Sequence, residues 1–283
     1  MTDPILSRAG AVKVTAALAL IATMPAAALA QEAPPPASPQ SASGDDLAQQ
    51  LQNPVASLIS VPIQTNVDFG IGPDDGFRIT TNLQPVVPIS INGRWNVISR
   101  TILPVIYQSD VSGPGASEFG LGDTVQSFFF SPKQVGDSGI IWGAGPAFLL
   151  PTGTRAELSG KKWGAGPTGV VLKQAGPVSF GMLASQLWSV AGDDARGDVS
   201  VGLIQPFVSY VNKDLVTYSA SVDVNHDWIA DQSTIPVNFG ISKLIKGKQP
   251  LSIGGGVRYY VEKPQGGPEW GLRMSVTLLF PQK

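Results

Sequence analysis

The sequence predicts an all-β protein: a transmembrane antiparallel up-and-down β-barrel of about 12 strands with both termini in the periplasm. Three observations support this fold class. The segment Trp270–Phe280 (WGLRMSVTLLF) is apolar at every even position, and its length is near the roughly 9–11 residues that a tilted strand needs to cross a bilayer. Charged residues make up only 14% of the chain, below the ~25% of soluble domains. Beyond the first 30 residues, however, no apolar run approaches the length of a membrane helix.

A soluble β-sandwich remains an alternative at this stage. Its strands show the same alternation, with the apolar rows turned to a protein core instead of lipid. The repeated strand length of around a dozen residues favours the barrel.

Residues 1–30 have the pattern of a secretory signal peptide. Arg8 and Lys13 are followed by an apolar stretch at residues 14–24 and by the small-residue site Ala28-Leu29-Ala30. The apolar stretch is shorter than the ~20 residues of a spanning helix. The chain contains no Cys, which excludes disulfides and a lipid-modified N-terminal Cys. We therefore expect cleavage after Ala30 and export to the outer membrane of a Gram-negative bacterium.

Residues 31–56 read as a Pro/Ser/Ala-rich periplasmic tether with a possible short helix. Asp45 and Asp46 would lie near the positive N-terminal end of a helix over residues 45–52, and Pro54 would stop it. Such a helix is either a lead-in to the first strand, which we favour, or a small plug or partner-binding element.

Residues 57–283 form the predicted barrel, in which strand-like segments and turn signals alternate. The twelve predicted strands are residues 57–69, 77–89, 95–108, 118–130, 140–151, 163–174, 178–190, 199–211, 215–227, 234–244, 250–262 and 269–280. The odd-numbered connections are the longer ones and would be external, whereas the even-numbered ones, including the Asn92-Gly93 hairpin, would be short periplasmic turns. Residues 70–76 and 131–139 depart from this alternation.

Prolines inside strands admit two interpretations. Pro85 and Pro206 interrupt strand-like segments, where Pro removes a ladder hydrogen bond. They either weaken the wall locally, opening a lateral gap toward lipid, or sit at bulges and strand ends, which we favour. The repeated Trp-Gly-Ala-Gly-Pro that begins at Trp142 and Trp163 predicts two bent strands or interfacial tryptophan anchors.

Charged residues within the strands are the candidate functional residues. An Arg on the lipid face costs about 2–4 kcal/mol at the midplane, so these side chains should face the lumen. They would form either a constriction that selects solutes or a structural ion-pair network, and Tyr260 would stack on an aromatic solute or fill space. The candidates are Asp68, Arg78, Arg100, Asp223, Arg258, Tyr260, Glu262 and Arg273.

Other chemistry has little support. The chain has one His, His226, which excludes metal sites built on several histidines, and its strand offers only Ser219 and Ser221 without a nucleophile motif. The formal net charge of −2 argues against a nucleic-acid partner. We expect no cofactor, no metal and no enzymatic activity.

Several blocks of sequence resemble a known family. They include LISVPIQTNVDFG, FGLGDTVQSFFFSP, WGAGPAFLLPTGT and KKWGAGPTGVVL, and the resemblance covers roughly Asn53 to the end. The family is the bacterial outer-membrane family labelled for the MetA pathway of phenol degradation, whose members are predicted transporters. The resemblance implies an outer-membrane barrel that passes small hydrophobic or aromatic solutes, and it supplies no site residues.

The sequence thus predicts a channel or transporter for small solutes that works by facilitated diffusion. Its partners would be outer-membrane lipid, the solute, and the barrel-assembly machinery acting on the C-terminal strand Trp270–Phe280. Two alternatives stay open: a non-transporting structural or adhesion barrel with a closed lumen, and a lipid-modifying barrel enzyme that uses His226.

Overall fold

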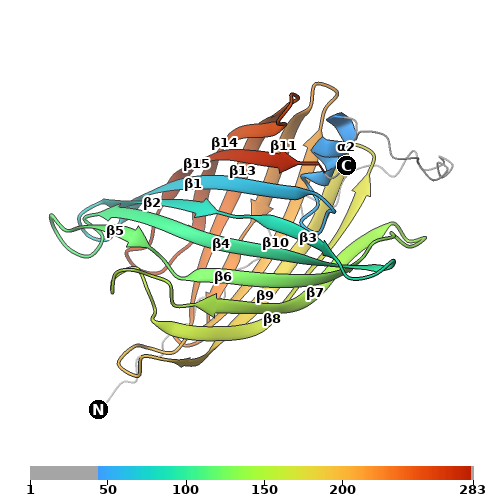
Figure 1. Ribbon diagram of the computed structural model, residues 1–283. Coiled ribbons are helices and arrows are strands. Elements are labelled where there is room, and N and C mark those ends of the chain that lie inside the picture. Colours follow the sequence, from blue (N-terminus) through green and yellow to red (C-terminus); the bar gives the residue numbers. More distant parts are fainter. Residues whose placement is uncertain (1–43, 282–283) are drawn as a thin grey trace, which may run out of the picture. The chain divides into compact units, whose positions relative to one another are not determined.

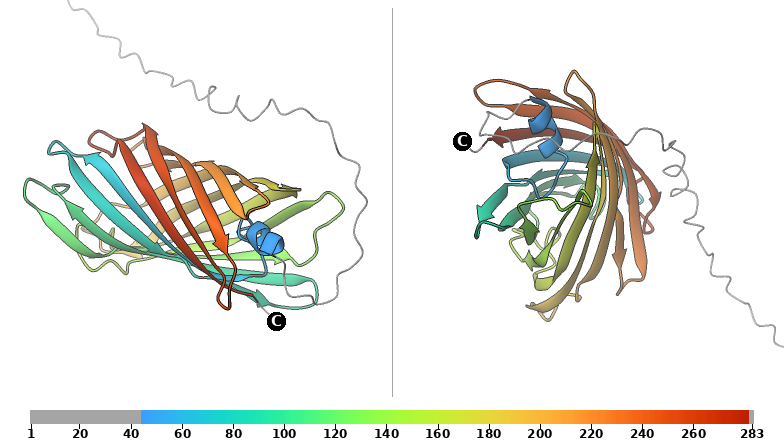
Figure 2. Two further views of the ribbon diagram at one scale, coloured as in Figure 1. Left: turned by 90° about the horizontal axis from the view of Figure 1, so that it is seen from above. Right: turned by 90° about the vertical axis from the view of Figure 1, so that its right-hand side faces the viewer.

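Within the part of the chain that the structure describes, twelve antiparallel strands close into a barrel, and one short helix lies at one of its ends (Figures 1 and 2). This is a computed structural model that describes residues 44–281. The predicted signal peptide and residues 31–43 of the predicted tether lie outside the described residues. The elements are α2 (Gly44–Gln50), β1 (Ile59–Ile71), β2 (Gly76–Leu83), β3 (Val86–Ser90), β4 (Trp95–Ser109), β5 (Ser117–Leu121), β6 (Thr124–Pro132), β7 (Ile140–Leu150), β8 (Lys162–Ala175), β9 (Val178–Gly192), β10 (Ser200–Val211), β11 (Val216–Val222), β12 (Val224–Asp227), β13 (Gln232–Ile245), β14 (Leu251–Glu262) and β15 (Trp270–Phe280).

The fifteen strand segments form twelve strands because β2 and β3, β5 and β6, and β11 and β12 each continue one another. Every strand pairs antiparallel with its neighbours in sequence. The barrel closes where β15 pairs with β1, from Ile59 opposite Phe280 to Phe69 opposite Trp270. This confirms the predicted fold and strand count. Because β1 starts where β15 ends, α2 and the C-terminus lie at the same barrel end, called here the α2 end.

Prolines account for the three interruptions. Pro85 separates β2 from β3, Pro104 faces the break between β5 and β6, and Pro206 faces the break between β11 and β12. A proline has no N–H to donate to the ladder, so the strand beside it is locally unpaired and bends. These positions agree with the interpretation of prolines at bulges.

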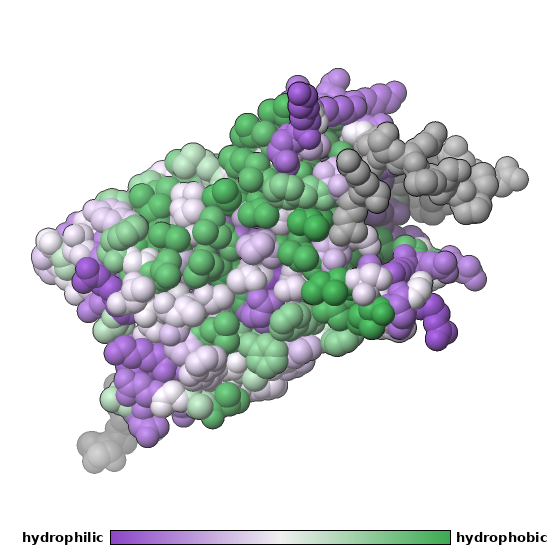
Figure 3. Space-filling model, in the orientation of Figure 1, coloured by the Kyte–Doolittle hydropathy of each residue, from purple (hydrophilic) through white to green (hydrophobic). Residues whose placement is uncertain are grey.

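The outer face of the wall is apolar. On β15, Trp270, Leu272, Met274 and Val276 are exposed and point outward, whereas the residues between them point inward. In the space-filling view, hydrophobic residues spread across the visible wall and hydrophilic residues gather toward the two ends (Figure 3). A wall of this kind is stable against lipid and would be insoluble in water.

The six tryptophans mark both rims of this apolar surface. Trp95 and Trp142 lie at the α2 end and contact each other edge to face, with ring centroids 5.9 Å apart. The other four, Trp163, Trp188, Trp228 and Trp270, lie toward the opposite end and are exposed. Two rims of aromatic residues are typical of membrane barrels, because indole rings partition to the lipid–water interface.

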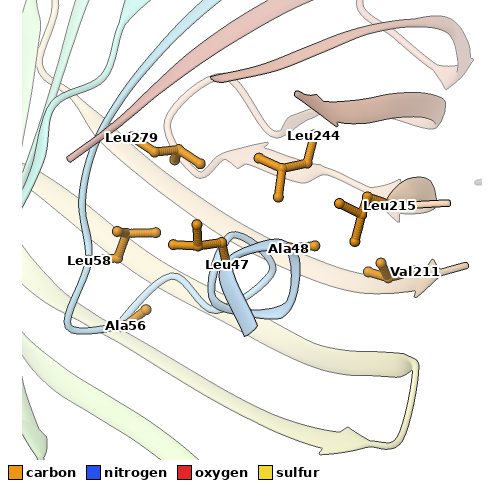
Figure 4. Packing of buried hydrophobic residues seen from close by; sticks show 8 residues of the cluster. All are labelled: Leu47, Ala48, Ala56, Leu58, Val211, Leu215, Leu244 and Leu279. Carbon is orange, nitrogen blue, oxygen red and sulfur yellow. The ribbon is translucent and has the colours of Figure 1, made fainter. Parts of the chain in front are cut away.

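Residues 44–58, called here the lumen segment, cover the inside of the α2 end. Helix α2 packs Leu47 and Ala48 against the ends of four strands, at Val211, Leu215, Leu244 and Leu279 (Figure 4). Gln49 is tied to the β8–β9 turn, since its Nε2 donates to Gly176 O at 3.0 Å and its carbonyl accepts from Gln174 Nε2 at 2.9 Å. The segment therefore does more than lead into β1.

Val55 lies deeper and contacts an apolar inner wall formed by Ile98, Phe129, Val170, Leu172 and Leu183. These residues come from β4, β6, β8 and β9. Strands in this half of the barrel are therefore apolar on both faces: one face meets lipid, and the other meets the lumen segment.

No helix among the described residues is long and apolar enough to span a membrane.

Candidate functional site

A row of polar residues crosses the inner wall toward the end opposite α2. Each member lies directly opposite the next on the neighbouring strand, so the row follows the register of the sheet. We call it the polar belt, and it runs through Glu118, Gln108, Arg78, Asp68, Gly271, Arg258, Asn238 and Ser221.

The centre of the belt is an ion pair. Arg258 Nη1 lies 3.3 Å from both carboxylate oxygens of Asp68, and the Tyr260 hydroxyl donates to Asp68 Oδ1 at 2.9 Å. The Arg258 and Asp68 side chains are only 11% and 10% exposed. The guanidinium also lies 5.3 Å from the centre of the Tyr260 ring. Two buried charges are tolerated here because each is paired and hydrogen-bonded.

Gly271 makes this pair possible. Arg258 on β14 and Asp68 on β1 are not neighbours, since β15 runs between them and Gly271 is the residue that faces both. A Cβ at position 271 would lie 2.4 Å from Asp68 Oδ1. The missing side chain therefore leaves the space in which the two charged groups meet.

Hydrogen bonds extend the belt in both directions. On one side, Arg258 Nε donates to Asn238 Oδ1 at 3.2 Å, and Asn238 Nδ2 donates to Asp223 Oδ2 at 3.0 Å. On the other side, Arg78 Nε donates to Gln108 Oε1 at 2.8 Å. The Gln108 amide in turn donates to Glu118 Oε2 at 3.0 Å. Each charge thus contacts a polar partner, which orders the inner wall.

A chamber of about 380 Å³ lies inside the barrel against the lumen segment. Residues 50–54, Ala56 and Leu58 line it on that side, and the wall contributes both apolar and polar side chains. Arg100 and Arg273 both line it. Arg100 Nη2 donates to Gln84 Oε1 at 2.9 Å, and Arg273 Nε donates to Asn66 Oδ1 at 2.8 Å.

The predicted candidates are therefore divided between two places. Asp68, Arg78, Asp223, Arg258 and Tyr260 belong to the belt or contact it, whereas Arg100 and Arg273 line the chamber. Glu262 is partly buried at the end of β14, past a register shift, and its carboxylate makes no hydrogen bond or ion pair with the other described residues. Sequence reasoning missed the neutral amides Asn66, Gln108, Gln205 and Asn238, although they share the inward alternation of the charged residues.

His226 contacts a serine other than the two predicted. Its Nδ1 lies 3.0 Å from Ser233 Oγ across the β12–β13 hairpin, and its Nε2 lies 3.8 Å from Asp231. The Asp231 side chain is 96% exposed. A hydrolase triad needs a buried acid that fixes the imidazole, and this carboxylate cannot do so. Within residues 44–281, no group of three or more His, Asp or Glu residues is placed to hold a metal ion.

Comparison with known proteins shows the fold. No family model and no curated protein matches the chain. Among solved structures, the chain is similar to the COG4313 outer membrane channel from Pseudomonas putida F1, with a TM-score of 0.62 at 15% identity, covering 79% of this chain and 96% of that one. The outer membrane phospholipase A from Escherichia coli aligns with a TM-score of 0.47 at 11% identity over 83% of this chain and 97% of that one. A Pseudomonas aeruginosa FadL homologue aligns with a TM-score of 0.39 at 11% identity, over 85% and 95%. The chain therefore has the fold of a twelve-stranded outer-membrane β-barrel.

Proposed function

We propose that this protein is an outer-membrane channel or transporter through which small solutes cross by facilitated diffusion. The observation that carries the proposal is the chamber of about 380 Å³ inside a closed barrel whose outer wall is apolar. A volume of this size holds one small molecule. The resemblance to the MetA-pathway family favours hydrophobic or aromatic solutes as the class to test.

The path through the barrel has two parts in this proposal. The polar belt sets the chemistry at the end opposite α2, and the lumen segment covers the other end, which we assign to the periplasm. Residues from Gly44 to Leu58 are held there by two small apolar clusters and a few hydrogen bonds. Displacement of this segment would connect the chamber to the periplasm. In the same proposal, the barrel-assembly machinery recognises Trp270–Phe280 during insertion.

Planar-bilayer conductance tests the proposal. The chain from residue 31 is refolded, its barrel is confirmed by heat-modifiable gel mobility, and its conductance is compared with that of a variant lacking residues 44–56. We expect larger or more frequent conducting steps without the segment, because the α2 end is then uncovered. A variant lacking only residues 31–43 is the matched control and should behave as the parent. If both the parent and the variant without residues 44–56 are folded but silent, the channel proposal fails.

The polar belt supports a second candidate function, a structural barrel with a closed lumen. Its hydrogen bonds run from Glu118 on β5 to Asp223 beside β11, interrupted only between Asp68 and Arg78. A network of this kind can fill a barrel as well as select a solute. The silent outcome of the conductance experiment would favour this function.

A further inference from the structure

The chamber carries positive charge that no carboxylate in its lining balances. Arg100 and Arg273 are the charged side chains among the described residues that line it, and Asp, Glu and Lys are absent from this lining. Both guanidiniums hydrogen-bond only to neutral amides, Gln84 and Asn66. The carboxylates of Asp68 and Asp223, in or beside the belt, already accept hydrogen bonds from Arg258, Tyr260, Gln205 and Asn238. Asp68 and Asp223 nevertheless lie close enough to act electrostatically on Arg273, whereas no acidic group acts on Arg100. A buried Arg without an acidic partner, such as Arg100, favours an anion.

The same chamber offers a large apolar surface. Leu58, Pro62, Val86, Leu183 and Phe207 line it together with the two arginines. An inorganic anion would leave this surface unused, and a purely hydrophobic solute would leave the Arg100 guanidinium without an anionic partner. The lining therefore matches a molecule that has both an anionic group and an apolar body.

A buried hydroxyl adds an independent observation. Ser209 is 4% exposed and lines the chamber, and its Oγ is the one buried side-chain polar atom within residues 44–281 that has no hydrogen-bond partner. Buried polar atoms in proteins are almost always satisfied, so an orphan at a cavity wall indicates a missing partner. A bound solute with an acceptor oxygen would satisfy it.

We propose that the chamber binds a small amphipathic monoanion, a carboxylate on an aromatic or short aliphatic body, with Arg100 holding the carboxylate. The inference rests on the proposed channel function and names its solute class. A planar guanidinium matches the two oxygens of a carboxylate, and the apolar wall receives the body of the solute. The carboxylate of a solute would thus supply the acidic partner that Arg100 lacks among the described residues.

Calorimetric titration of the refolded chain, from residue 31 to the end, tests the proposal in a non-ionic detergent. The probes are benzoate, its neutral analogue benzamide, and acetate, which has the charge without the apolar body. We expect saturable benzoate binding at least about tenfold tighter than that of benzamide or acetate. Arg100→Gln should weaken benzoate binding by about tenfold and leave benzamide binding unchanged. Arg94→Gln, which removes an exposed charge in the β3–β4 turn, should change nothing.

The outcomes separate this proposal from the channel proposal. Benzoate binding no tighter than benzamide binding, or unchanged by Arg100→Gln, would overturn the anion site. Equal binding of acetate and benzoate would overturn its amphipathic character. If a variant does not refold, the relative affinities of the parent chain for benzoate, benzamide and acetate still test the proposal. Benzoate flux into liposomes is measured separately. Binding without flux supports the anion site and contradicts the channel proposal. Flux without selective binding supports the channel proposal and contradicts the anion site.

Discussion

Replacing Gly271 by Ala should break the ion pair at the centre of the belt. The new Cβ would lie 2.4 Å from Asp68 Oδ1 and 2.7 Å from the Val67 carbonyl oxygen on the neighbouring strand. The backbone of β1 is held by its ladder with β15, so the Asp68 side chain must move away from Arg258. Overpacking costs about 1–3 kcal/mol, and complete loss of one partner of a buried pair costs about 3–5 kcal/mol. Because both charges remain and can partly re-pair, we expect a loss of about 2–4 kcal/mol in the free energy of unfolding.

Urea unfolding in detergent, followed by tryptophan fluorescence and gel mobility, measures this effect. Gly255→Ala is the matched control, because it lies on the adjacent strand β14 and the atom nearest to its new Cβ is 3.6 Å away. The variant Asp68→Ala should reduce the cost of Gly271→Ala, since the group that clashes is then absent. Equal stability of Gly271→Ala and Gly255→Ala would refute the reasoning.

Three further predictions concern the wall, a loop at the end opposite α2 and the hairpin of His226. Met274→Lys, on the exposed outer face of β15, should lower the unfolding free energy in bilayers by about 2–4 kcal/mol, whereas its inward neighbour Ser275→Lys should cost much less; equal effects would contradict the assigned facing. Hydrogen bonds from Lys162 and Ser189 hold the pKa of Asp198 below its ordinary value. A depressed pKa stabilises the folded loop above the unfolded pKa of about 3.9 and loses that effect as the pH falls through the lower folded value. Protection of the Val199 amide against hydrogen exchange, corrected for intrinsic rates, should therefore stay constant down to about pH 4 and fall below it; a loss near pH 6 would implicate another group. His226→Ala should leave phospholipid turnover at the background level of the parent, and measurable turnover that this substitution abolishes would revive the lipid-modifying enzyme.

Most of the fold could be predicted from the pattern of residues that are near one another in the chain. The alternation in Trp270–Phe280 assigned its lipid face and its lumen face correctly, because the direction of a strand side chain depends on its own position alone. The same argument correctly predicted that Asp68, Arg258 and Arg273 face inward. Applied to the neutral amides beside them, it would have predicted the same direction. Alternation gave no facing for the apolar residues of β4 and β9, where both faces are apolar, because the inner face meets Val55 of the lumen segment, which is distant in the chain.

The sequence by itself determined the strands, their number, the barrel class and the facing of those strands that alternate, since each of these depends on local spacing and composition. The tertiary structure alone decided which inward residues meet. Arg258 and Asp68 are 190 residues apart, and their contact requires closure of β15 on β1 with Gly271 at the crossing point. The register of all twelve strands likewise placed Arg100 and Arg273 at the chamber, which the belt residues Ser221 and Asn238 also line. Local alternation states only whether a side chain faces inward, whereas its height in the barrel depends on the register of every strand between two partners.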